Sequence, residues 1–423
     1  MQPEKKCALV LGDDLRIFLT VVRSLGRAGI RVHAAPFDWH APALKSKYVS
    51  EVHRLPGYSD DPEGWLSKLQ TLVAEHQFEL IIPCCDRAIL PLDLHRSQIN
   101  GTKLAIPQST AMDRLFDKEL TRDMATGAGI PVVPGRRLSS PDTAQELISE
   151  FGLPLVLKPS RSYAIDKLDT WGRVWIIENV SQLSQALAAI DEPGRYLVEG
   201  YFAGEGVGVS VISEGGNIAL AFQHRRLREG WGGSSSFRIS ESVDEPLLDA
   251  CRKICQHTAL TGVCMFEFRV NRKRAEWVLL ETNARFWGSL ALPVSLGVDF
   301  PKYLYEFLVN GVRPPSQTYR VGVRSRNVAL DARNILANLS RSGWTRLPET
   351  AGAIASFFAQ PMNWLLGREI SDTVVIDDLR PAFAELLDLT KAAVSTRRGL
   401  GMPRDRSKGD GGVPATASNV GAK

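Results

Sequence analysis

The sequence predicts an α/β protein that also contains antiparallel α+β parts, and three observations support this fold class. In the first segment, apolar runs such as Cys7–Leu11 and Leu80–Pro83 alternate with helical periodicity, as in Leu15–Ala28, which is the rhythm of a parallel sheet. Farther along, apolar runs joined by polar turns predict antiparallel strands at Val207–Ile212 and Val263–Val270. The 423 residues suffice for about two to four domains.

The composition is that of an ordinary globular protein. Apolar residues make up 44% of the chain and charged residues 23%, which excludes wholesale disorder and a disulfide-stapled miniature fold. The net charge of +4 is too small for this length to predict nucleic-acid binding. The six cysteines form no CxxC pair, and neither a secretory signal nor a bilayer span is expected. We therefore expect a reduced, cytoplasmic location.

The first segment, which we place at residues 1–108, is expected to form a Rossmann-like domain. A dinucleotide-binding turn needs three spaced glycines after the first strand. Here the strand ends at Gly12, and Asp13 and Asp14 follow it. The sequence therefore excludes an NAD or FAD fingerprint at this turn.

Four further segments follow the first. Residues 109–198 mix helices and strands and begin with one predicted helix, Ala111–Thr126. Residues 199–310 hold the long antiparallel strands, and residues 311–398 are expected to be a helical extension. The tail at 399–423 is rich in glycine, proline, serine and charge and has no apolar period, which predicts disorder.

Two glutamates and an asparagine form the most informative constellation. Glu267, Glu281 and Asn283 lie in apolar strands, where an unpaired carboxylate is costly and needs a partner or a metal. Three oxygen donors, two of them anionic, suit a hard cation such as Mg²⁺. The alternative is that both glutamates form salt bridges, with Arg269 and Arg285 as partners, and the spacing alone does not decide between the two.

The loop between these two strands decides whether the glutamates share a face. Glu281 and Asn283 are two residues apart and face the same way in an extended strand. A loop of five residues places Glu267 opposite Leu279 and on the face of Glu281. A loop of four residues places Glu267 opposite Val278, on the other face.

Two lysines are candidates for binding phosphate. Lys158 ends the apolar strand Leu153–Leu157, so its ammonium group points either into a cleft or to solvent. Lys118 lies within the helix predicted after Leu115, where a solvated helix face is the alternative. A lysine ammonium is a compact charge that suits phosphate oxygens.

Several other stretches have both a functional and a structural interpretation. Gly204–Gly208 is similar to a phosphate loop but leads into a strand, which favours strand-turn glycines. The connection Glu199–Phe202 either offers backbone groups to an adenine or simply links two strands. The basic run His224–Arg228 is either an anion site or a solvated strand end. The apolar stretch Ala351–Gly367 lacks a flanking basic cluster, which favours a core helix or a homodimer contact over a membrane-surface helix.

Taken in order, these motifs resemble the ATP-grasp superfamily, in the branch of carbamoyl-phosphate-synthase-like proteins and carboxylate–amine ligases. No single motif is decisive, and the ordered set from about Cys7 to Asn310 carries the resemblance. The loop after Lys158 departs from the family because it contains one glycine where a glycine-rich lid is usual. The motifs are Asp117-Lys118, Gly129-Ile130-Pro131, Leu155–Pro159, Val198–Phe202, Gly204–Gly206, Glu267 and Glu281–Ser289.

The resemblance implies an ATP-grasp fold, with ATP held between subdomains at 109–198 and 199–310 beside the Rossmann-like domain. It implies ATP and Mg²⁺ as cofactors, with Mn²⁺ as a substitute metal. The site residues that it implies are Lys118 and Lys158 for the phosphates, Glu199 and Phe202 for the adenine, Glu205 for the ribose, Glu267, Glu281 and Asn283 for the metal, and Arg285 for the transferred phosphoryl group.

The resemblance also implies a reaction. A carboxylate attacks the γ-phosphate, and an amine then displaces phosphate from the acylphosphate to form an amide, so the expected partners are two small molecules. An ATP-grasp phosphotransferase that releases an acyl- or carbamoyl-phosphate is one alternative. A nucleotide-binding module with impaired turnover, suggested by the altered loop after Lys158, is another.

Overall fold

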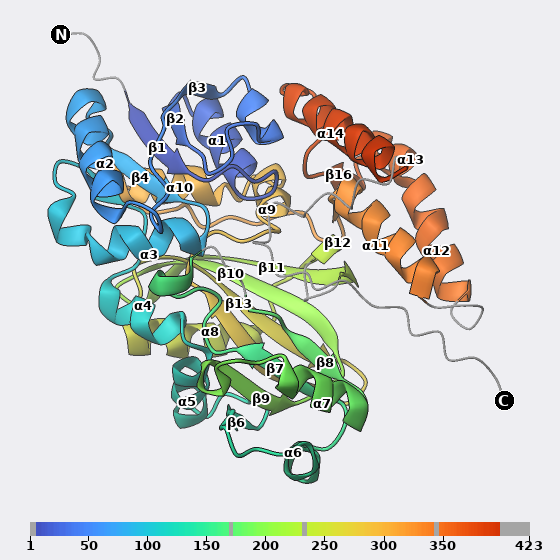
Figure 1. Ribbon diagram of the computed structural model, residues 1–423. Coiled ribbons are helices and arrows are strands. Elements are labelled where there is room, and N and C mark those ends of the chain that lie inside the picture. Colours follow the sequence, from blue (N-terminus) through green and yellow to red (C-terminus); the bar gives the residue numbers. More distant parts are fainter. Residues whose placement is uncertain (1–5, 169–171, 231–234, 342–346, 398–423) are drawn as a thin grey trace.

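The computed structural model describes residues 6–168, 172–230, 235–341 and 347–397, so the predicted tail at 399–423 lies outside the described residues. Figure 1 shows the N-terminal domain in blue, the two sheets of the middle part in green and yellow, and the C-terminal extension in orange and red beside them. Among the described residues, no helix is both long and apolar enough to cross a bilayer.

The N-terminal domain has the parallel sheet that the strand–helix rhythm predicts. Its strand order is β3-β2-β1-β4-β5, and every strand pair in it is parallel. The strands are β1 Cys7–Leu11, β2 Arg31–Ala35, β3 Val49–Val52, β4 Leu80–Pro83 and β5 Lys103–Leu104, and the helices are α1 Phe18–Arg27, α2 Pro62–His76 and α3 Asp86–Leu94, with a 3-10 turn, η1, at Pro42–Lys45.

A four-stranded antiparallel sheet follows, in the order β6-β9-β7-β8. The predicted helix Ala111–Thr126 is wrong, because the segment forms two helices. Asp117 has an extended backbone and caps the second helix by accepting hydrogen bonds from the amides of Glu119 and Leu120. The elements are α4 Ser109–Leu115, α5 Lys118–Gly127, β6 Gly135–Arg137, α6 Ala144–Phe151, β7 Leu155–Pro159, β8 Trp175–Ile177, α7 Val180–Ala188 and β9 Tyr196–Gly200.

The third sheet has seven strands in the order β14-β13-β10-β11-β12-β15-β16. The alternation in Val207, Val209 and Val211 buries one face of β10 against helix α8 (Glu245–Thr258), in a shared apolar cluster. The opposite face carries Gly206, Gly208 and Ser210, and Ile212 on that face packs in the core shared with the N-terminal domain. The strands are β10 Glu205–Glu214, β11 Asn217–Glu229, β12 Ser235–Glu241, β13 Gly262–Asn271, β14 Glu276–Asn283, β15 Arg324–Arg326 and β16 Glu369–Ser371.

The sequence predicted a helical C-terminal extension. The extension also contains two strands, β15 and β16, which continue the seven-stranded sheet. The stretch Ala351–Gly367 is also not a core helix, since Phe358 and Leu365 are each 76% exposed. The extension reaches the N-terminal domain through Arg23, which donates to the Asp378 carboxylate at 2.9 Å. Its helices are α11 Val328–Arg341, α12 Leu347–Phe358, α13 Gln360–Leu365 and α14 Arg380–Arg397.

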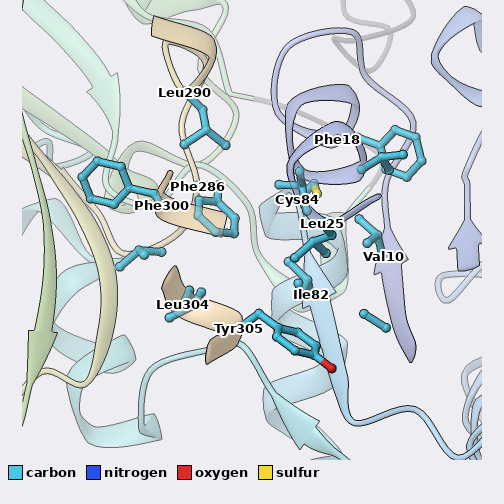
Figure 2. Close-up of a cluster of buried hydrophobic side chains, with 14 of the residues drawn as sticks. Val10, Phe18, Leu25, Ile82, Cys84, Phe286, Leu290, Phe300, Leu304 and Tyr305 are labelled. Atoms are coloured by element: carbon cyan, nitrogen blue, oxygen red, sulfur yellow. The ribbon is translucent and has the colours of Figure 1, made fainter. Parts of the chain in front are cut away.

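One apolar core joins the N-terminal domain to the segment that follows β14 (Figure 2). Phe18 and Ile82 of the first domain lie in the same buried cluster as Phe286 and Leu290. Two helices of that segment, α9 Ala291–Ser295 and α10 Phe300–Asn310, contribute Leu292, Phe300, Leu304 and Tyr305 to it. This core fixes the end of β14 against the carboxyl ends of the parallel strands.

Candidate active site

The two predicted metal-ligating glutamates face each other across β13 and β14. The loop between these strands has four residues, and in a regular ladder it would place Glu267 opposite Leu280. A β-bulge between Glu267 and Phe268 shifts the register by one residue, so that Glu267 pairs with Glu281 instead. The two registers considered from the sequence are therefore both wrong, but the glutamates do share a face.

Each of these carboxylates lies beside a cation of its own. Arg226 lies 2.5 Å from Glu267, whereas Lys118 lies 3.6 Å from Glu281. Burial raises the pKa of Glu267, and the Arg226 guanidinium opposes this rise only in part. Burial also acts to raise the pKa of Glu281, but Lys118 and Lys158 outweigh it and lower that pKa. The alternative left open by the sequence, salt bridges to Arg269 and Arg285, is wrong in its partners, because these arginines bind Glu229 and Asp86 instead.

The two lysines reach β14 from the four-stranded subdomain. Lys158, at the end of β7, is 6% exposed, and its Nζ donates to the carbonyl oxygen of Leu280 at 3.4 Å. That carbonyl belongs to the residue that the bulge adds to β14. Lys118 is the first residue of α5, where its side chain is 12% exposed and donates to Ser162 Oγ at 3.4 Å. Neither lysine lies on a solvated surface, so the structural alternatives for both are wrong.

Glu199 is buried in β9 and has two cationic partners. Its carboxylate lies 2.7 Å from Lys158 Nζ and 2.7 Å from an Arg122 nitrogen. A carboxylate held in this way does not point toward an adenine, so its part in base binding would come from the backbone near Gly200. Phe202 is half-buried and lies just beyond the end of β9. The sequence analysis did not identify Arg122, because no local pattern indicates that it pairs with Glu199, 77 residues away.

The glycines of β10 make room for basic side chains of β11. A Cβ on Gly208 would lie 2.3 Å from the His224 ring, and one on Gly206 would lie 2.7 Å from Arg226 Cδ. Gly204–Gly208 therefore belongs to a strand and its approach, as the sequence favoured. The interpretation of the basic run as a solvated strand end is wrong, because His224 is buried and Arg226 binds Glu267. Arg226 belongs to the run that the sequence analysis considered as an anion site, but its contact with Glu267 was not predicted.

Arg285 connects the end of β14 to the N-terminal domain. Its Nε donates to the Asp86 carboxylate and its Nη1 donates to the carbonyl of Phe286 at 2.9 Å. Asp86 is the first residue of α3, directly after β4. The carboxyl ends of parallel strands are where ligands bind in such sheets, and this rule could have identified Asp86. Burial raises the pKa of the nearby Tyr163 to about 12, with a further contribution from Asp86.

Glu205 lies at the start of β10, in a partly exposed group of ion pairs. Arg225 and Arg272 each lie 2.9 Å from its carboxylate, which is 43% exposed. Both arginines also contact Glu241, at 2.6 Å and 2.7 Å. Its role toward a ribose remains a prediction from the resemblance.

The donor set fits a magnesium ion. Glu267 and Glu281 are directly opposite each other, and the Asn283 amide lies 3.4 Å from Glu281 Oε1. All three groups offer oxygen, two as carboxylates, which is the ligand chemistry of a hard cation that keeps some of its waters. The lysines and Arg226 supply positive charge around the same point, as a triphosphate requires.

Comparisons with known proteins agree with this geometry. The family model described as "ATP-grasp in the biosynthetic pathway with Ter operon" matches residues 192–329. Biotin carboxylase 1 of Bacillus subtilis is 23% identical over 189 residues, which are 42% of this chain and 42% of that protein. Phosphoribosylamine–glycine ligase of a Synechocystis strain is 26% identical over 184 residues, 40% of this chain and 42% of that protein. The matched part thus spans less than half of these relatives.

A solved structure shares the fold over most of the chain. It is the biotin carboxylase domain of the 2-oxoglutarate carboxylase from Hydrogenobacter thermophilus, a dimer in complex with MgADP, ADP and bicarbonate. The TM-score is 0.59 at 18% identity, and the similarity covers 75% of this chain and 73% of that one. The covered share exceeds the family-model match, so the fold extends beyond residues 192–329.

Proposed function

From the premise that this chain is a member of the ATP-grasp superfamily, we propose that it is an ATP- and Mg²⁺-dependent ligase that joins a carboxylate to an amine. The observation that carries the proposal is the bulge at Leu280, which brings Glu267 opposite Glu281 and offers a carbonyl to Lys158. Acidic oxygens of one subdomain thereby face lysines of the other. This arrangement supports the binding of a metal-complexed triphosphate between the two.

Each charged residue has a proposed role. Lys118 and Lys158 bind the phosphates, and the triphosphate competes with Glu281 and Glu199 for their ammonium groups. The metal ligands are Glu267, Glu281 and Asn283, and Mn²⁺ substitutes for Mg²⁺ there. When bound, the ion neutralises charge on the phosphate oxygens. Phe202 and the backbone at Glu199 contact the adenine, and Glu205 the ribose.

Arg285 is the proposed catalytic residue. Its guanidinium is anchored to Asp86 and Phe286 and therefore has a fixed position at the end of β14. A fixed cation stabilises charge that develops on a transferred phosphoryl group without a reorganisation cost at the moment of reaction. Asp86 is a positioning residue in this scheme, because it acts through Arg285.

The proposed reaction has two steps. A substrate carboxylate oxygen attacks the γ-phosphorus, the bond to the β,γ-bridging oxygen breaks, and ADP leaves. The amine nitrogen then attacks the acyl carbon, phosphate departs and the amine loses a proton. This chain contributes position and charge to both steps and needs no nucleophilic side chain. With domain boundaries at residues 108, 198 and 310, as we propose, the reaction takes place between the second and third segments and beside the first.

The test is an assay of ADP and amide formation with full-length protein, ATP, Mg²⁺ and panels of carboxylates and amines. A ligase sustains ADP release over many turnovers only when both substrates are present, because the amine must discharge the acylphosphate. Release of ADP with the carboxylate alone, without amide, would favour the phosphotransferase. Measurable ATP binding without ADP under any condition would favour the binding module.

The decisive variant is Glu281→Ala, with Glu276→Ala as its matched control on the same strand. Glu276 is 54% exposed and has only a 3.9 Å contact with Arg274. We expect Glu281→Ala to reduce Mg²⁺-dependent turnover by about a hundredfold or more, because it removes a metal ligand. Glu276→Ala should retain full turnover, and both should keep the wild-type unfolding temperature to within a few degrees. Full turnover in Glu281→Ala would contradict the metal assignment.

A further inference from the structure

Three histidines and a glutamate meet in one corner of the N-terminal domain, away from every residue of the candidate active site. They are His33, Glu51, His53 and His76, and one potential ligand atom of each lies within 4.8 Å of those of the others. His33 belongs to β2, Glu51 to β3, His53 follows β3, and His76 ends α2. Only the fold brings them together, since up to 43 residues separate them in the sequence.

The histidine rings pack as a group rather than as separate core side chains. His33 and His53 stack at a centroid distance of 5.0 Å, and His76 lies 4.8 Å and 4.7 Å from them. Phe78 packs against His33 and His76 at 5.2 Å and 5.4 Å. His33 is 2% exposed and His53 8% exposed. Burying several imidazoles together costs free energy unless their nitrogen atoms have hydrogen-bond or metal partners.

The register explains why His33 faces inward. In the parallel pairing of β1 and β2, His33 lies beside Leu9, whose side chain belongs to the apolar core under α2. The neighbouring side chains of this layer, such as Leu9 and Phe78, are apolar and fully buried. The imidazole therefore occupies a core position on the same layer as α2, where His76 ends the helix.

The charges around the cluster suit a cation. Glu51 lies 3.7 Å from His33 Nδ1 and 3.8 Å from His53 Nδ1. Neutral imidazoles have a lone pair free for a metal, and the carboxylate brings a negative charge. Arg31, Lys68 and Glu75 are the other charged groups that act on these rings.

We propose that His33, Glu51, His53 and His76 form a Zn²⁺ site. Three imidazoles and one carboxylate are a ligand set for a borderline transition metal, in contrast to the oxygen donors of the magnesium site. With metal–ligand bonds of about 2.0–2.1 Å, tetrahedral ligand atoms are about 3.3 Å apart. His33 Nδ1 and His53 Nε2 now share a hydrogen bond of 2.7 Å. A small rotation of the rings breaks this hydrogen bond and makes both nitrogen atoms available to the metal.

The site also has an entry path and a structural consequence. The Glu51 side chain is 52% exposed, so it reaches the rings from the solvent side. β3 is the edge strand of its sheet and has four residues. A metal bound by Glu51, His53 and His76 ties this short edge to α2. The neighbouring Ser46 and Tyr48 bind Asp378 and Asp377 of the extension, so the same corner holds the C-terminal part.

The test uses the untagged full-length chain, with Zn²⁺ by calorimetry and Co²⁺ as a spectroscopic stand-in. Glu51→Ala and His76→Ala remove the two ligands that are not buried. Glu63→Ala, in the first turn of α2, and His257→Ala are exposed controls of the same residue types. We expect one equivalent of Zn²⁺ and a Co²⁺ spectrum of a tetrahedral site that Zn²⁺ abolishes. Affinity should fall about tenfold in Glu51→Ala and about a hundredfold in His76→Ala, and stay unchanged in both controls.

A second measurement separates this site from adventitious binding. A metal that links residues distant in sequence stabilises only the folded state, so saturating Zn²⁺ should raise the unfolding temperature of the wild-type chain. A chelator should reverse the rise, and His76→Ala should not show it. Equal Zn²⁺ affinity in all five chains, or no thermal shift at saturation, would overturn the proposal. Since neither readout requires ATP turnover, failure here would leave the proposed ligase function intact.

Discussion

The two edges of the seven-stranded sheet carry charged networks of opposite character. At one edge, Arg326 of β15 lies 2.5 Å from Asp331 and 2.7 Å from Glu369, and all three side chains are 0% exposed. At the other edge, Lys118 lies 3.6 Å from Glu281, whose side chain is 30% exposed. The first network is closed on itself, whereas the second has longer contacts between its two subdomains, and Glu281 is open to solvent.

The closed network saturates its donors. Arg326 donates further to the carbonyl and hydroxyl oxygens of Ser356, at 3.2 Å and 3.1 Å, and its guanidinium lies 3.8 Å from the Phe237 ring centroid. Asp331 accepts another hydrogen bond from Ser236 at 2.7 Å. Because these side chains already have protein partners, the closed network offers no free donor to a ligand. Its function is to hold the extension to the sheet.

The open network differs because its partners belong to different subdomains. Lys118 and Lys158 come from one subdomain, and Glu281 and Leu280 from the other. Contacts of 3.4–3.6 Å across that boundary are readily exchanged for a better anion. The comparison teaches that long contacts across a subdomain boundary, rather than charge content, distinguish the candidate site from the structural ion-pair network.

The largest effect should come from opening the closed network. Arg326→Ala leaves Asp331 and Glu369 buried without this partner, and breaking a buried pair in this way costs about 3–5 kcal/mol. We expect the unfolding temperature to fall sharply, with the extension leaving the sheet. Chemical denaturation followed by circular dichroism measures the change.

Arg324→Ala is the control for that substitution, because Arg324 is exposed on the same short strand. It should change the free energy of unfolding by no more than about 0.5 kcal/mol. If Arg326→Ala were as stable as Arg324→Ala, the closed network would have no structural role. The distinction between the two edges would then fail.

A smaller effect is expected from Lys158→Ala, this time on ligand binding. A hydrogen bond to a charged group contributes about 1.5–3 kcal/mol, which corresponds to a loss of ATP affinity of about ten- to a hundredfold. Glu199 keeps Arg122 as a partner, so the fold should survive. Calorimetry with ATP measures the affinity, and the exposed Lys253→Ala is the control. An unchanged affinity for ATP would contradict a phosphate role for Lys158.

Local patterns explain which parts of the fold and site the sequence could predict. The alternation of valines in β10 and the apolar runs of β1 and β4 are read from neighbouring residues, and the structure has these strands. Glu281 and Asn283 could be paired from their spacing of two. Lys118 could be selected only from the resemblance, because its helix cap at Asp117 breaks the helical pattern that the sequence predicted.

The remaining features depend on contacts that no local pattern contains. The bulge at Leu280 depends on the pairing of β13 with β14. A loop length alone therefore does not predict it. The pair of Arg285 with Asp86 joins residues 199 positions apart. The strands β15 and β16 have three residues each, too few for a period of two to be visible. The sequence therefore predicted which acidic residues share a face better than it predicted their partners.

The smallest effect should come from Glu205→Gln, which tests an intermediate kind of ion pair. Glu205 is 43% exposed, and its two arginines keep Glu241 as a partner, so we expect a loss of stability below about 1 kcal/mol. If its carboxylate takes the ribose hydroxyls, ATP affinity should fall about three- to tenfold. The matched control is Glu214→Gln, at the other end of β10 and paired with Arg313 at 2.6 Å.

A comparison of ATP with its 2′-deoxy analogue sharpens this last prediction. The wild-type chain and Glu214→Gln should both prefer ATP, because a carboxylate that accepts from the 2′-hydroxyl loses that bond with the analogue. Glu205→Gln should bind the two nucleotides with more nearly equal affinity. An undiminished preference for ATP in Glu205→Gln would remove its ribose role. The group around Glu205 would then resemble the closed network in function, although its exposure makes it far weaker.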